Sequence, residues 1–139
     1  MRRTAGVWVL VAAGLFVAAA GYAQMAMPKE KAVTVTGVLV DTKCYSMNPA
    51  NVGGDHDTPK GRVPSCAAAC AKMGLPVGLR TANGQVIVLV APSGAFADHM
   101  AKEARVTGAK VYQGSLRPDK VEVKGADGQW KEISIATMM

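Results

Sequence analysis

Residues 33–40 read Val-Thr-Val-Thr-Gly-Val-Leu-Val, and this stretch decides the fold. Valine and threonine are branched at Cβ, so they favour the extended backbone of a strand. Gly37 interrupts the run at a place where a strand bends or bulges. We therefore predict one long, curved first strand that ends before Thr42.

The segment that follows, residues 42–64, is rich in Asn, Gly, Asp and Pro and keeps no apolar pattern. Such a composition predicts a long loop. Loops of this length inside a compact domain are usually functional, or are held by a ligand or a crosslink. This one contains Cys44 and His56.

The rest of the chain alternates helix and strand signals. Asn83-Gly84 supplies the two positive-φ residues of a tight hairpin turn, and Pro64-Ser65 supplies a stop and an N-cap. A second helix starts at Pro92-Ser93-Gly94, with a turn expected over 116–119. The expected helices are Cys66–Met73 and Ser93 to about Ala104, and the later strands are Val77–Thr81, Val86–Val90, Arg105–Gln113, Val121–Lys124 and Trp130–Ile135.

This order predicts a mainly β fold with two short helices. A strongly bent antiparallel set of five or six strands, with a helix between the third and fourth, matches an OB-like barrel. The triplet Val35-Thr36-Gly37 recurs as Val106-Thr107-Gly108, which suggests matched bending roles in two strands. The fold class alone does not define a function, because OB-like barrels bind many kinds of ligand.

The chain resembles small exported bacterial proteins of OB-like fold. The resemblance is carried by residues 35–44, which end a strand in Asp41 and Cys44, by the Cys-Ala-Ala-Ala-Cys run at 66–70 with Gly74 after it, and by residues 106–108. It covers most of residues 33–135. It implies a strand ending in Asp and Cys, a loop with a histidine, a Cys-three-Cys helix, a hairpin and a closing group of strands, and it implies no activity.

The N-terminal segment has the pattern of a signal peptide. Arg2 and Arg3 precede a stretch without charge over residues 5–20, and residues 21–23 read Gly-Tyr-Ala. We predict a signal peptide over 1–23, a flexible lead-in over 24–31 and a single OB-like domain over 32–139. An uncleaved anchor is the alternative, because the apolar run approaches the roughly 20 residues that span a bilayer. Cleavage would leave a periplasmic or secreted protein.

The charge balance points to no specific partner. The whole chain has a formal net charge of +6, and loss of the two N-terminal arginines would leave +4, spread along the sequence without a cluster. A dispersed positive charge with few aromatic residues indicates a solvated surface rather than a nucleic-acid site. We expect an unknown ligand or protein partner, no nucleic acid, and no membrane contact after cleavage.

The three cysteines form the candidate site. Cys66 and Cys70 lie four residues apart, on one face of the predicted helix, which suits chelation better than a bond within the helix. Cys44 and His56 can reach that face, which gives a Cys₃His set for zinc or, because thiolates are soft ligands, copper. The open alternative is a disulfide from Cys44 to Cys66 or Cys70 that staples the loop and leaves one thiol over.

Two further roles follow from position. Cys66 starts its helix, where unpaired N–H groups favour a thiolate, so it is the most reactive of the three cysteines. Asp41 is placed to orient His56 from behind, although an aspartate at the end of a strand more often forms a turn. The sequence therefore favours an exported, non-enzymatic binding module, with a periplasmic thiol-redox protein that uses Cys66, resolved by Cys44 or Cys70, as the alternative.

Overall fold

The computed structural model describes residues 31–112 and 114–135. The predicted signal peptide, and all of the lead-in except Lys31, lie outside the described residues. Within the described ranges, no helix combines the length and apolar character needed to cross a membrane.

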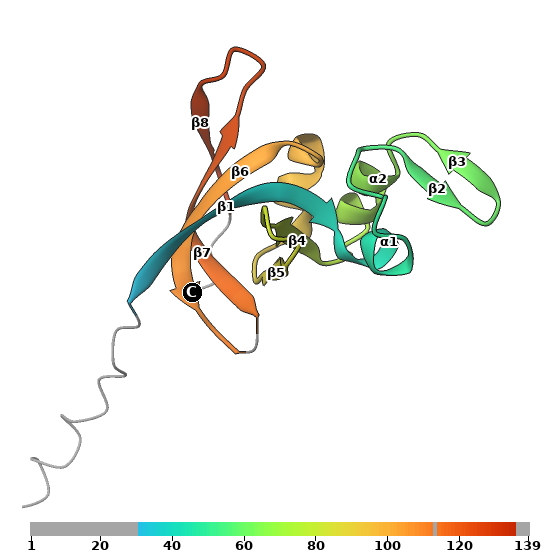
Figure 1. The fold of residues 1–139 in the computed structure, drawn as a ribbon. Helices are drawn as coiled ribbons and strands as arrows, with labels where there is room; N and C mark the ends of the chain where they lie inside the picture. The colour runs from blue at the N-terminus through green and yellow to red at the C-terminus, as the bar shows by residue number, and fades with distance from the viewer. Residues whose placement is uncertain (1–30, 113, 136–139) are drawn as a thin grey trace, which may run out of the picture.

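A six-stranded sheet forms the body of the molecule, in the order β5-β4-β1-β6-β7-β8 (Figure 1). β1 (Ala32–Asp41) is the predicted long first strand, and it pairs with β6 through its first part and with β4 through its last part. β5 also pairs in parallel with β7, so that β1, β4, β5, β7 and β6 form a closed ring of hydrogen-bonded neighbours. The other strands are β4 (Val77–Arg80), β5 (Val86–Leu89), β6 (Glu103–Lys110), β7 (Ser115–Lys124) and β8 (Trp130–Ile133).

The two Val-Thr-Gly triplets occupy close crossings of the backbone. A Cβ atom on Gly37 would lie 2.4 Å from the carbonyl oxygen of Arg80, and one on Gly108 would lie 2.0 Å from that of Arg117. The pairing of β6 with β7 also shifts register between Thr107 and Gly108. Both glycines therefore lie where a curved strand approaches its neighbour too closely for any side chain.

The predicted hairpin is confirmed, because β4 and β5 pair antiparallel around the Asn83-Gly84 turn. The predicted turn over 116–119 is wrong, since β7 runs continuously through these residues. Pro118 cannot donate a backbone hydrogen bond. The register shift opposite Gly108 accommodates it inside the strand.

Both predicted helices are present, but the described residues contain a third helix that was not predicted. α2 (Cys66–Lys72) matches expectation, whereas the 3₁₀ helix η1 (Ser93–His99) stops short of Ala104 because β6 begins at Glu103. The expected long loop contains α1 (Thr42–Met47) and the hairpin of β2 (His56–Thr58) and β3 (Gly61–Val63). α1 was not predicted because its six residues are too few to show the spacing of apolar residues that marks a helix. Asp41 caps it.

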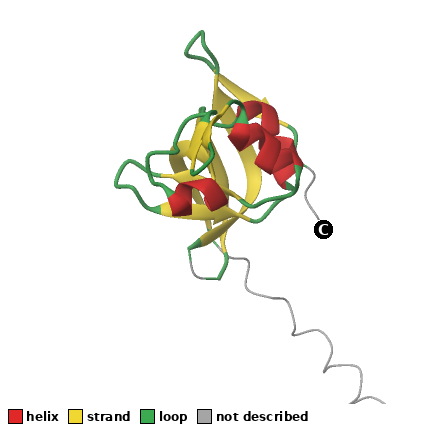
Figure 2. Ribbon diagram, turned by 90° about the vertical axis from the view of Figure 1, so that its right-hand side faces the viewer, coloured by secondary structure: helices red, strands yellow, loops and turns green. Residues whose placement is uncertain are grey.

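The core lies between the curved sheet and two of the helices. Leu39, Leu79, Phe96 and Leu116 are fully buried, and Ala67 and Ala71 of α2 join them. In Figure 1 the helices lie toward the end of the sheet where β1 finishes, and Figure 2 turns that end toward the viewer. The segment between β1 and β4 is folded onto this end, and it carries all three cysteines.

Candidate metal centre

The junction of β1 and α1 positions the first cysteine. The buried carboxylate of Asp41 accepts hydrogen bonds from the backbone N–H groups of Lys43 at 3.0 Å and Cys44 at 3.4 Å. Such side-chain acceptors satisfy the free donors of a helix start. The cap begins α1 directly after the strand and turns Cys44 inward, where it is 9 % exposed.

α2 presents the other two cysteines. Cys66 is its first residue and Cys70 follows one turn later, so their side chains share a face. Ser65 occupies the expected N-cap position, but its side chain makes no capping bond. The N–H of Ser65 instead donates to a carboxylate oxygen of Asp55 at 2.9 Å, and the N–H of Ala67 donates to the carbonyl of Gly54 at 3.1 Å. The loop thus fixes the start of the helix.

The three sulfur atoms converge. The Sγ atoms of Cys44, Cys66 and Cys70 all lie within 4.8 Å of one another, and those of Cys44 and Cys66 are 3.9 Å apart. A disulfide needs about 2.05 Å, so no disulfide is at bonding distance. Two thiolates on a tetrahedral zinc ion, each at about 2.3 Å from the metal, lie about 3.8 Å apart. The cluster could therefore hold a metal ion.

His56 completes a second group that shares Cys44. Ligand atoms of Asp41, Cys44 and His56 also lie within 4.8 Å of one another. The His56 ring is fully buried, and its Nε2 lies 3.1 Å from the carbonyl oxygen of Gly53. A carbonyl only accepts, so Nε2 carries the hydrogen and a neutral ring leaves a lone pair on Nδ1. That Nδ1 atom has no hydrogen-bond partner among the described residues.

Asp41 lies behind the histidine without bonding it. Its Oδ2 is 3.9 Å from His56 Nδ1, which is beyond hydrogen-bond reach. The oxygens of this carboxylate cap α1, and they place negative charge beside the cluster. A metal ion among these groups would offset that charge.

Asn51 connects the elements of the site, and sequence reasoning missed it. It is 4 % exposed, and its side chain accepts from the Asp57 N–H at 2.9 Å and donates to the carbonyls of Cys44 at 3.4 Å and Asp57 at 3.2 Å. These bonds tie α1 to β2 next to His56. An asparagine in a polar loop gives no signal of such a role, because its partners are backbone atoms that only the fold brings near.

Burial keeps two of the thiols protonated. It raises the pKa of Cys44 to about 12 and that of Cys70 to about 11, and in both cases the nearby Asp41 carboxylate adds to the effect of burial. A neutral thiol is favoured where a second negative charge would be desolvated. A metal ion bound here would therefore displace protons from sulfur.

The structure brings every predicted site residue to one end of the sheet. Cys44, Cys66 and Cys70 form one cluster, and His56 and Asp41 lie next to Cys44. Comparison of the chain with protein-family models, curated proteins and solved structures finds no match.

Proposed function

We propose that this protein is an exported, non-enzymatic binding module built on an OB-like barrel, and that Cys44, Cys66, Cys70 and His56 hold one zinc ion. The observation that carries the proposal is the His56 Nδ1 atom. It is buried, it lies near Cys44, and it has no hydrogen-bond partner among the described residues. A buried polar atom without a partner costs free energy. A coordinate bond to zinc would satisfy it.

Zinc fits this donor set better than copper. Three thiolates and one imidazole make a tetrahedral structural site for zinc. Cu(I) is satisfied by soft sulfur ligands alone and gives no reason to bury an imidazole with a free lone pair. Four protein ligands also leave no open position for a substrate, which is the pattern of a structural site rather than a catalytic one.

The zinc ion would organise the segment between β1 and β4. The β2–β3 hairpin has three residues in each strand, which is too short for independent stability. It projects from the molecule in Figure 1, and His56 lies at its base, opposite Val63 in the pairing of the two strands. Coordination would join this base to α1 and α2 and thereby hold the hairpin in place.

The barrel and export parts of the proposal have separate support. The closed ring of pairings, with its parallel β5–β7 contact and η1 between β5 and β6, supports an OB-like barrel to which β8 is added at the edge. The paired arginines and the uncharged run near the N-terminus support export.

Metal content tests the proposal directly. Protein purified from the periplasm without chelators should contain one zinc ion per chain, measured by inductively coupled plasma mass spectrometry. Its three thiols should resist alkylation until a strong chelator is added. Protein that contains no metal after growth with zinc, and that alkylates all three cysteines at once, would overturn the proposal.

A thiol-redox role is the second candidate, because Cys66 is the most accessible of the sulfurs and lies 3.9 Å from a second one. Its thiolate would attack a disulfide of a partner protein, and the Cys44 thiolate would then break the mixed disulfide and release the reduced partner. The raised pKa of Cys44 disfavours that second step. Catalysed reduction of a model disulfide by the metal-free protein would favour this candidate.

His56→Ala should weaken zinc binding while the fold persists. The substitution removes one of four ligands, and the three sulfurs still form a cluster. Loss of a residue that only supports a ligand costs roughly 10- to 100-fold in metal affinity, so loss of the ligand itself should cost at least about tenfold, measured by competition with a colorimetric chelator. His99→Ala, on η1, is the matched control and should retain full affinity; equal affinity in both variants would exclude His56 as a ligand.

Zinc affinity should rise steeply with pH. Cys44 and Cys70, with pKa values raised to about 12 and about 11, remain protonated near neutrality and must each lose a proton to the solvent on binding. Each released proton changes the apparent affinity about tenfold per pH unit, so we expect at least about a hundredfold gain per unit between pH 6.5 and 7.5. Competition titrations at several pH values measure this slope, and a flat profile would contradict thiolate ligation.

A further inference from the structure

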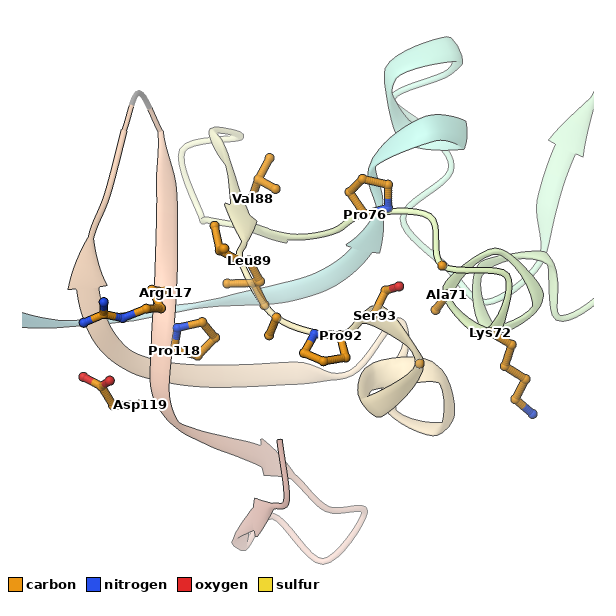
Figure 3. Close-up of a pocket in the computed structure, with 14 residues that line it drawn as sticks. Ala71, Lys72, Pro76, Val88, Leu89, Pro92, Ser93, Arg117, Pro118 and Asp119 are labelled. Carbon is orange, nitrogen blue, oxygen red and sulfur yellow. The ribbon is translucent and has the colours of Figure 1, made fainter. Parts of the chain in front are cut away.

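A large cavity lies on the other side of α2 from the sulfur cluster. Its volume is about 1200 Å³, which is large enough for a small organic molecule. α2 and the turn after it form one wall, β5 and the start of η1 form the second, and β7 forms the third (Figure 3). The aliphatic and proline residues on these walls are Ala71, Pro76, Leu89, Ala91, Pro92 and Pro118.

The walls are apolar, fixed and in part open to water. Three prolines hold their backbone φ angles near −65° and limit how far the cavity can collapse. Val88 and Val90 line the cavity and remain 37 % and 51 % exposed. Neighbouring exposed apolar side chains around a cavity mark a surface that gains free energy when a ligand covers it.

Among the described residues that line the cavity, the charged side chains point away from its interior. Figure 3 shows Pro118 of β7 pointing toward Leu89, whereas Arg117 and Asp119 point away from it. Alternate side chains of a strand face opposite sides, which explains this arrangement. Lys72 of α2 is 65 % exposed and pairs with Asp98 at 3.6 Å. An ionised ligand group would therefore lose water and find no inward-facing partner.

Ser93 gives the cavity one polar group. It is 8 % exposed, and it lines the cavity at the start of η1. In Figure 3 it lies between Pro92 and Ala71, and α2 packs directly on η1. A hydroxyl both donates and accepts hydrogen bonds, and from its place on the cavity wall the Ser93 hydroxyl can bond a ligand.

From the apolar walls, the outward charges and the single hydroxyl, we infer that this cavity binds an uncharged, apolar small molecule that has one hydrogen-bonding group near Ser93. The site is separate from the zinc ligands, and neither depends on the other's residues. α2 contributes to both, with Cys66 and Cys70 on one side and Ala71 and Lys72 at the cavity.

A matched pair of fluorescent probes tests the inference on the full chain. N-phenyl-1-naphthylamine is uncharged and carries one N–H group, and 1-anilinonaphthalene-8-sulfonate adds a negative charge to a similar body. The uncharged probe should bind saturably at one site per chain, and the sulfonate at least about tenfold more weakly. Equal binding of both probes, or no saturable binding, would overturn the inference.

Variants then locate the binding site. Gly94 lines the cavity and a Cβ atom on it would meet no atom within 4 Å, so Gly94→Phe places a ring at the cavity wall from a position that accepts a side chain. Gly94→Phe, or Val90→Trp as a second blocking variant, should weaken the uncharged probe at least about tenfold, and Ser93→Ala about fivefold, as expected for one hydrogen bond. Ala126→Phe, in the exposed β7–β8 turn, is the control and should bind the uncharged probe normally.

The zinc content should stay at one per chain in all four variants, which separates this test from that of the metal centre. Unchanged probe binding in both blocking variants would show that the cavity is not the site.

Discussion

Cys44→Ser should abolish stoichiometric zinc binding and loosen the whole segment between β1 and β4. Cys44 is the only residue common to the two groups of candidate ligands, and its sulfur lies 3.9 Å from that of Cys66. Because loss of a residue that only supports a ligand costs up to about a hundredfold in metal affinity, loss of this ligand should cost at least about a hundredfold. Because structural zinc contributes directly to folding, the free energy of unfolding should fall by roughly 3 kcal/mol or more in zinc-containing buffer.

Ser46→Ala provides the matched control for this variant. Ser46 lies on the same helix, is exposed, and its hydroxyl donates only to the Lys43 carbonyl. Urea denaturation with and without chelator, together with amide hydrogen exchange over residues 42–76, measures both effects. A Cys44→Ser protein that keeps one zinc and normal protection would show that Cys44 is not a ligand.

Gly108→Ala should destabilise the sheet as severely as a large core deletion. The added methyl carbon would lie 2.0 Å from the carbonyl oxygen of Arg117 and 2.9 Å from the Cα of Pro118, both backbone atoms that cannot rotate away. The strands would have to separate at the register shift. We expect a loss of about 3 kcal/mol or more in the free energy of unfolding.

Gly94→Ala is the control for the loss of glycine itself, since its Cβ would meet open space. It should change the free energy of unfolding by less than about 1 kcal/mol, measured by urea denaturation. Similar stability of the two alanine variants would contradict the close crossing of β6 and β7.

The strands were predictable where local chemistry alone decides them. The β-branched run of β1 and the Asn83-Gly84 turn between β4 and β5 act within a few residues, and both predictions are confirmed. The second part of β7 was predicted as the strand Val121–Lys124, but its first part was missed because Pro118 signals a turn in isolation. Pro118 fits inside a strand because the register shifts opposite Gly108. That shift is a property of the two paired strands and not of the local sequence.

The short helices show a similar limit. α1 has six residues and begins at a carboxylate cap, and the same Asp41 is equally typical of a turn without a helix. The helix exists because the returning chain packs on it, for example where the Thr42 N–H donates to the carbonyl of Pro76 at 3.2 Å. A contact across so many residues leaves no local pattern in the sequence.

The candidate site was predictable as a set of residue types but not as a geometry. The four-residue spacing of Cys66 and Cys70 on a helix indicates that both sulfurs face one point, and Cys44 was the remaining cysteine. The sequence could not show that the Gly53 carbonyl holds His56 Nε2, or that Asn51 joins α1 to β2. Those contacts fix the ring so that Nδ1 is left without a partner. This free nitrogen is the main argument for a fourth ligand.

Zinc K-edge X-ray absorption on the purified protein tests the central claim most directly. The account predicts three sulfur neighbours at about 2.3 Å and one nitrogen neighbour at about 2.0–2.1 Å, with the multiple-scattering signature of an imidazole ring. His56→Ala should remove that signature and leave the sulfur shell. A spectrum of oxygen and nitrogen neighbours without sulfur would contradict the account.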